Sequence, residues 1–151
     1  MKIFLSVPFS SRIDDEGNVK ADYRAAIEDL IKTLRASKHE VFCALEHTGW
    51  SMGGLTLPEE EFKKDLQEID RADKLVILLE ERVSAGVQLE NGYAFAKGKA
   101  LEIYQIGQMA WSNMAFGRLS GNDIIPVKSV LDFVHQAKSH DSQVGPGSSA
   151  G

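Results

Sequence analysis

The chain has 151 residues, of which 43% are hydrophobic and 26% charged, a composition that suits one globular domain with a sizeable core. Lysine and arginine number 17 against 22 aspartates and glutamates, and this net charge of −5 argues against a dedicated nucleic-acid binder. A single cysteine excludes an intrachain disulfide and a cysteine-rich zinc site, and no apolar run approaches the roughly 20 residues that span a membrane. Because the N-terminal residues become polar too soon for a signal peptide, we expect a cytoplasmic protein.

The first part of the chain predicts a strand, a helix and a second strand. Residues 3–7 form an apolar run that ends at Pro8, and residues 40–45 form another. Between them, residues 21–37 place apolar side chains at three- and four-residue steps, which is typical of an amphipathic helix. The apolar stripe of this helix comprises Tyr23, Ala26, Ile27, Leu30, Ile31 and Leu34.

The loops that follow these two strands carry candidate ligand contacts. Phe9 is either a plug in the core or a platform on which a base stacks. Ser10 and Arg12 suit a phosphate or ribose contact, and equally a solvated loop. In the second loop, Trp50 either caps the core or forms one wall of a base pocket, and His47 is either a surface residue or a catalytic one.

Residues 58–73 predict a second helix, with Pro58 in its first turn. Three apolar positions mark the face that we expect to be buried: Phe62, Leu66 and Ile69. Asp65 adjoins that face, where it either points to solvent or tilts toward a pocket. Residues 74–79 follow as a run rich in valine, isoleucine and leucine, which is typical of a strand buried in a parallel sheet.

The stretch after this strand, residues 84–94, predicts a helix that ends at Gly98 and places Glu90 within its first two turns. Open α/β sheets bind ligands at the carboxyl ends of their strands, which is where Glu90 is expected. The positive end of the helix favours an ionised carboxylate there, and such a group can attack carbon or stabilise a cation. A glutamate that faces water is the alternative, and a pocket with perturbed titration would distinguish the two.

The C-terminal part predicts a strand at residues 101–106, a segment of uncertain form at 107–119 and a short strand at 124–127. Pro126 in that last strand indicates the edge of a sheet, since proline cannot donate to a ladder. A helix follows at 129–137, capped by Ser129. We therefore expect one domain over residues 1–138 and a disordered Gly/Ser-rich tail over residues 139–151.

The alternation of strands and helices predicts a flavodoxin-like α/β sandwich of three layers, with a five-stranded parallel sheet in the order 2-1-3-4-5. In that order the topological switch point lies between the first and third strands. The loop that begins at Phe9 and the turn that leads to Glu90 are then expected to meet.

Residues 84–94 also carry a family resemblance, through the pattern S-x-G-x-x-x-E-x-G-Y-A after an apolar strand. Over residues 2–119 the chain resembles the nucleoside 2-deoxyribosyltransferase superfamily and, within it, the nucleoside 5′-monophosphate N-glycosidases. The resemblance implies that Glu90 is the nucleophile on the anomeric carbon and that Ser84 binds the 5′-phosphate. It places Asp65 near the ribose and the leaving base, and it assigns Ser112 and Asn113 to a phosphate contact made from a neighbouring subunit.

The same resemblance places Gly86 and Tyr93 of the motif beside the substrate. The loop at Pro8 and Phe9 is similar to the branch that hydrolyses CMP and hydroxymethyl-CMP, in which the phenylalanine stacks on cytosine. The implied activity is hydrolysis of the N-glycosidic bond of CMP or a modified CMP, to free base and ribose 5-phosphate. It implies no metal, no cofactor and no nucleic-acid or membrane partner.

A homodimer with a shared active site is the implied assembly. Three alternatives to CMP hydrolysis remain: a 2′-deoxynucleotide hydrolase, a transferase that moves the sugar between bases of unphosphorylated nucleosides, and a nucleotide-binding module without turnover.

Overall fold

The computed structural model describes residues 1–54, 57–82, 84–107 and 124–143. All strand pairs are parallel and form one sheet in the order β2-β1-β3-β4-β5. The strands are β1 (Lys2–Ser6), β2 (Glu40–Cys43), β3 (Lys74–Leu79), β4 (Ala100–Ile106) and β5 (Ile124–Val127). This order confirms the predicted flavodoxin-like topology and places β5, with its Pro126, at an edge of the sheet.

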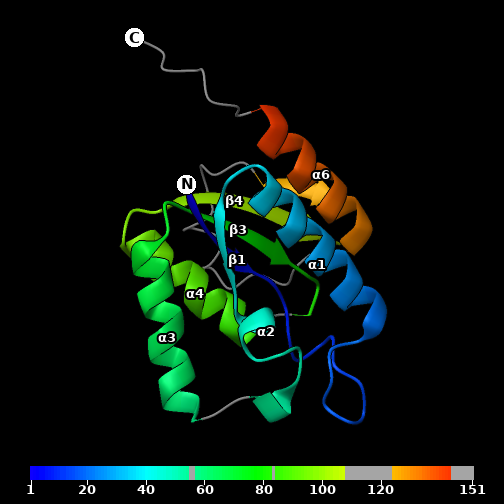
Figure 1. Cartoon of the computed structure of the whole chain (residues 1–151). Coiled ribbons are helices and arrows are strands. Elements are labelled where there is room, and N and C mark those ends of the chain that lie inside the picture. Colours follow the sequence, from blue (N-terminus) through cyan, green and yellow to red (C-terminus); the bar gives the residue numbers. More distant parts are fainter. Residues whose placement is uncertain (55–56, 83, 108–123, 144–151) are drawn as a thin grey trace.

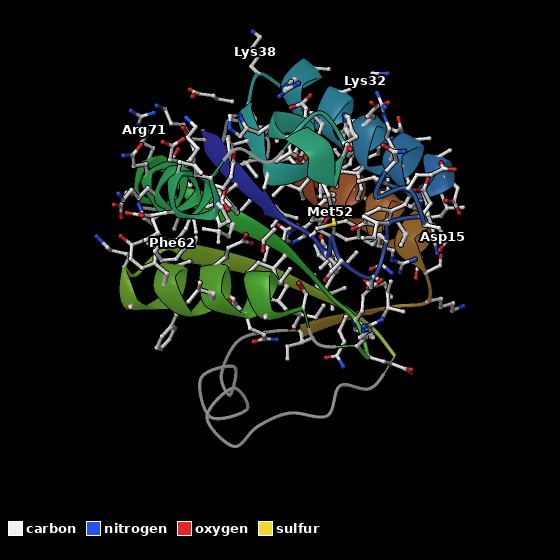
Figure 2. All side chains as sticks on the ribbon, turned by 90° about the horizontal axis from the view of Figure 1, so that it is seen from below. Asp15, Lys32, Lys38, Met52, Phe62 and Arg71 are labelled. Atoms are coloured by element: carbon white, nitrogen blue, oxygen red, sulfur yellow. The ribbon has the colours of Figure 1, made fainter. Side chains whose placement is uncertain are left out.

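Two pairs of helices sandwich the sheet, as Figures 1 and 2 show. Helices α1 (Ala21–Ala36) and α6 (Val130–Gln143) pack against each other on one face. Helices α3 (Pro58–Arg71) and α4 (Ala85–Ala96) pack against each other on the opposite face. A short helix α2 (Ala44–His47) follows β2 directly, and a 3-10 turn η1 (Met52–Gly54) lies further along the same connection.

The core consists of two apolar clusters, one on each face of the sheet. Strand β3 contributes to both, because Val76 and Leu78 face α1 and α6 whereas Leu75 and Ile77 face α3 and α4. This explains why its sequence is continuously apolar instead of alternating. The stripe predicted for α1 is confirmed in full, since all six of its residues are buried. Within the described ranges, no helix combines the length and apolar character needed to cross a bilayer.

Two predictions differ from the structure, one for the end of β2 and one for the burial of Phe62 on α3. Strand β2 ends at Cys43, and the last two residues of the expected strand begin α2 instead. A short apolar run does not distinguish a strand from a helix by periodicity, which explains this error. Phe62 was expected to be buried but is 45% exposed. It shares a helix face with the buried Ile69 but lies two turns earlier, about 10 Å further along the helix axis, so it does not share the contact of Ile69 with the core.

The last helix continues to Gln143, past its predicted end at residue 137. Contacts with distant residues hold this extension. His39 Nε2 lies 2.7 Å from Asp141 Oδ1, and His140 Nδ1 lies 3.1 Å from Glu102 Oε2. Local sequence carries no signal for such pairs, so residues 139–143 were assigned to the tail. Residues 144–151 lie outside the described part of the chain, and the division into domain and tail remains a prediction.

Candidate active site

A cavity of about 170 Å³ opens at the carboxyl ends of the central strands, between the β1 loop, α2, α3 and the start of α4. It brings together five residues that the sequence predicts to be in the site: Phe9, Asp65, Ser84, Gly86 and Glu90. The rest of its described lining is Val7, Ala44, Leu45, Thr48, Glu61 and Val87. The predicted meeting of the β1 loop with the turn before α4 is therefore confirmed at Phe9.

Glu90 lies in the second turn of α4 and its carboxylate reaches back to the end of β1. There the Ser6 hydroxyl donates a hydrogen bond to Glu90 Oε2. Burial raises the pKa of Glu90 to about 8, the Ser6 hydrogen bond opposes this shift, and the nearby charge of Asp65 adds to it. The sequence predicts that the helix terminus favours ionised Glu90, but the effect of desolvation on the pKa is larger. The protonated form of Glu90 is therefore favoured at neutral pH.

Asp65 projects from the middle of α3 into the same cavity, so it does not simply point to solvent. Burial is the main reason that its pKa rises to about 6, and the charge of Glu61, one helical turn earlier, raises it further. His47 has the opposite effect on the Asp65 carboxyl. The cavity therefore holds two carboxyl groups with different proton affinities, which is the arrangement that acid–base chemistry needs.

Ser84 is the N-cap of α4, and its hydroxyl oxygen accepts a hydrogen bond from the backbone N–H of Val87 at 3.5 Å. The first N–H groups of a helix have no partner within the helix, and together with the helix dipole they attract anions. Space is open beside this helix end. A Cβ added at Gly86 would meet nothing nearer than Ser84 Oγ at 4.0 Å, so a ligand can approach the backbone closely.

The β1 loop holds Phe9 at the cavity through contacts on its far side. The Tyr23 hydroxyl donates to the Pro8 carbonyl at 2.9 Å, and Ser11 Oγ donates to Glu80 Oε2 at 3.0 Å. Phe9 also packs against the core cluster on the α1 side, so it both plugs the core and lines the cavity.

Four further residues predicted to bind substrate do not line this cavity. Arg12 pairs with the buried carboxylate of Glu80 and lies 5.0 Å from the centre of the Tyr23 ring. Ser10 is exposed in the same loop. Trp50 lies in the core on the α1 side, and the Tyr93 hydroxyl contacts Asp70. A role in binding for any of these four remains a prediction.

Trp50 has the core-capping position that the sequence left open. It is 6% exposed, belongs to the cluster on the α1 side, and adopts a left-handed φ of 64°. Tyr93 donates its hydroxyl to Asp70 at 3.0 Å, on the outer side of α3 and α4. Ser112 and Asn113 lie outside the described residues.

Three residues that shape the candidate site or the loop beside it were missed by the sequence analysis. Ser6 is a polar residue at the end of an otherwise apolar strand, and this position at the carboxyl edge is a signal that could have identified it. Glu61 lies one helical turn before Asp65, so the spacing could have placed it on the same wall. Glu80 follows β3 directly, and its pairing with Arg12 could not be read from local sequence.

The arrangement suits nucleophilic and acid–base chemistry on a substrate that carries an anion. Glu90 and Asp65 are the candidate reactive groups, and the start of α4 is the candidate anion site. Among the described residues, no cluster of three or more histidines, cysteines, aspartates or glutamates has the geometry to hold a metal ion.

No family model and no curated relative matches the chain. Solved structures do match it. The CMP N-glycosidase BcmB of Clostridium botulinum has a TM-score of 0.63 at 19% identity, over 90% of this chain and 97% of that one. BlsM has a TM-score of 0.61 at 21% sequence identity, over 99% of this chain and 97% of that one. A 2-deoxyribosyltransferase from Leishmania mexicana gives 0.62 at 14%, over 92% and 98%.

At these identities the matches establish the fold. The chain has the fold of the nucleotide N-glycosidase and deoxyribosyltransferase structures, as the pattern in residues 84–94 predicts.

Proposed function

We propose that this protein hydrolyses the N-glycosidic bond of a nucleoside 5′-monophosphate, with CMP or a modified CMP as the substrate. The observation that carries this proposal is the position of Glu90, buried beside Asp65 in a cavity that also contains the N-terminus of α4. The shared fold with a CMP N-glycosidase supports it.

The proposed reaction has two steps. A carboxylate oxygen of Glu90 forms a bond to C1′ as the C1′–N bond breaks, and the electron pair of that bond passes to the base. Asp65 donates a proton to the departing base. Water then attacks C1′ and gives a proton to Asp65, which releases ribose 5-phosphate and regenerates the Glu90 carboxylate.

The phosphate is proposed to bind at the start of α4. The Ser84 hydroxyl and the free backbone N–H groups of the first turn are suitable donors, and Gly86 leaves room for the phosphate oxygens. Ser112 and Asn113 from a second copy of the chain are proposed to complete this cradle, which makes a homodimer the working unit. Binding energy from the phosphate then positions the sugar for reaction.

The cavity lining favours a base that carries an amino group. Glu61 presents carboxyl oxygens, which accept hydrogen bonds from the exocyclic amine of cytosine. Uracil has a carbonyl oxygen at that position, and two acceptors facing each other in a cavity are unfavourable. Phe9 provides an aromatic face on which the pyrimidine stacks.

A panel of ribo- and deoxynucleoside monophosphates, with the matching nucleosides, tests the proposal by chromatography of the free base. We expect cytosine and ribose 5-phosphate from CMP, less release from UMP, and no turnover by Glu90→Ala. The exposed Glu60 on α3 offers a matched control, Glu60→Gln, that should keep wild-type activity.

Two other results would contradict the proposal. Base exchange on unphosphorylated nucleosides, with every nucleotide left intact, would favour a transferase. Thermal stabilisation by CMP without release of base would favour a binding module.

A further inference from the structure

A third carboxylate, Glu61, lies on the cavity wall beside the two reactive groups. It precedes Asp65 by one turn of α3, a spacing that puts the two side chains next to each other. His47 of α2 flanks Glu61 from outside, with Nε2 3.7 Å from Glu61 Oε2. The Glu61 side chain is 16% exposed and that of His47 is 43% exposed. His47, Glu61 and Asp65 therefore follow one another from the solvent into the cavity.

The proposed reaction needs a proton on Asp65 and none on Glu90. The proton affinities in the structure have the opposite order, since the pKa of Asp65 is about 6 and that of Glu90 about 8. At neutral pH the reactive form is therefore a minor one, in equilibrium with a form that carries the proton on Glu90. Any neighbour that favours the proton on Asp65 increases the reactive fraction.

We propose that Glu61 is a positioning residue whose negative charge keeps a proton on Asp65 for the departing base, with His47 moderating that charge from the outer side. This inference rests on the proposed hydrolysis. Glu61 and His47 affect protonation through Asp65, so neither is required to contact the reacting atoms. Glu61→Gln keeps an oxygen that can accept the hydrogen bond proposed from the base.

The charges around Asp65 support this assignment. The groups that face it are Glu61, Lys64 and Glu68 on α3, His47 on α2 and Glu90 on α4. Among the first four, Glu61 has the largest effect on the Asp65 pKa, and it raises that pKa. Glu68 is held by Lys64 at 2.6 Å and by Arg71 at 3.2 Å, so much of its charge is compensated. Glu61 is also the member of this set that shares the cavity with Asp65 and Glu90.

The pH dependence of kcat/KM distinguishes this role from a structural one. For Glu61→Gln we expect the acid limb to move to lower pH, with a loss of roughly three- to tenfold at pH 7, corresponding to a pKa decrease of about half to one unit. Below the Asp65 midpoint the variant and wild type should coincide, because Asp65 is protonated in both. His47→Gln should move the same limb to higher pH, and Glu60→Gln should leave it in place.

A carbon-13 NMR titration of the Asp65 carboxyl gives a second readout that needs no turnover. Glu61→Gln should lower its midpoint and Glu61→Asp should largely restore it. An unchanged or raised midpoint in Glu61→Gln, or a rate loss equal at every pH, would overturn the inference. Failure of the wild type to release base from any nucleotide would instead refute the proposed function, and the titration would still decide the role of Glu61.

Discussion

Replacing Glu90 with glutamine should stabilise the protein at neutral and alkaline pH. The carboxamide is close in shape to the carboxyl group, and its oxygen still accepts a hydrogen bond from Ser6. What the substitution removes is the cost of ionising a buried acid. The expected gain is therefore a function of pH, which separates it from a general packing effect.

The size and sign of this effect follow from linkage. The pKa of Glu90 is raised from 4.5 to about 8 on folding, so the unfolded chain releases this proton first as the pH increases. The contribution to stability is complete below pH 4.5 and is lost as the pH rises toward 8. Each pKa unit corresponds to about 1.4 kcal/mol, so wild type should lose up to about 3 kcal/mol at pH 7 relative to its protonated state.

Urea denaturation of wild type and Glu90→Gln at pH 5, 6, 7 and 8 measures the difference directly. We expect the variant to exceed wild type in stability by less than about 1 kcal/mol at pH 5 and by roughly 2–3 kcal/mol at pH 7. Asp65 remains in both proteins, so its own titration largely cancels. Parallel stability curves, or a variant that is less stable at pH 8, would refute the argument that Glu90 is held protonated by burial.

Three further substitutions or truncations test other parts of the structure. Gly86→Ala should preserve or increase helix stability, by up to about 1 kcal/mol. In steady-state assays the same substitution should raise KM for the nucleotide. Gly92→Ala, on the same helix with open space around it, is the control and should leave KM unchanged. Arg12→Met should cost about 2 kcal/mol in denaturant melts because it leaves the buried carboxylate of Glu80 without its cation, and wild-type stability would contradict this. A chain ending at residue 138 should melt at a lower temperature than one ending at residue 143, because it lacks the contact between Asp141 and His39. Equal melting temperatures would show that the extension of α6 contributes nothing to stability.

The topology could be predicted because each level of the sequence pointed to the same arrangement. Apolar runs alternate with amphipathic helices, right-handed crossovers restrict the order of strands, and Pro126 identifies an edge. The position of Glu90 follows from the same logic, since a residue just after a central strand must lie at the carboxyl edge of the sheet. Local pattern and fold topology were therefore sufficient to place Glu90 at the cavity that forms the candidate site.

Which of the candidate residues line the cavity depends on contacts between distant residues, and these could not be predicted. Two backbone hydrogen bonds direct Trp50 into the core. The Trp50 N–H donates to the Leu45 carbonyl at 2.8 Å, and the Val19 N–H donates to the Trp50 carbonyl at 2.9 Å. Both bonds require the folded loop. Arg12 looked equally suited to a phosphate, but the buried Glu80 lies beside it in the fold. A buried carboxylate competes strongly for a nearby cation, and a sequence gives no measure of that competition.

The same burial that makes Glu90 costly to ionise also supports its proposed role. A carboxylate stripped of water is a stronger nucleophile and stabilises a developing cation better than one in solvent, because the local dielectric is low. The cost falls on the folded state, where the apolar clusters on both faces of the sheet offset it. If the proposed function is correct, Glu90→Gln should therefore gain stability and lose turnover together, as expected where a site trades stability for activity.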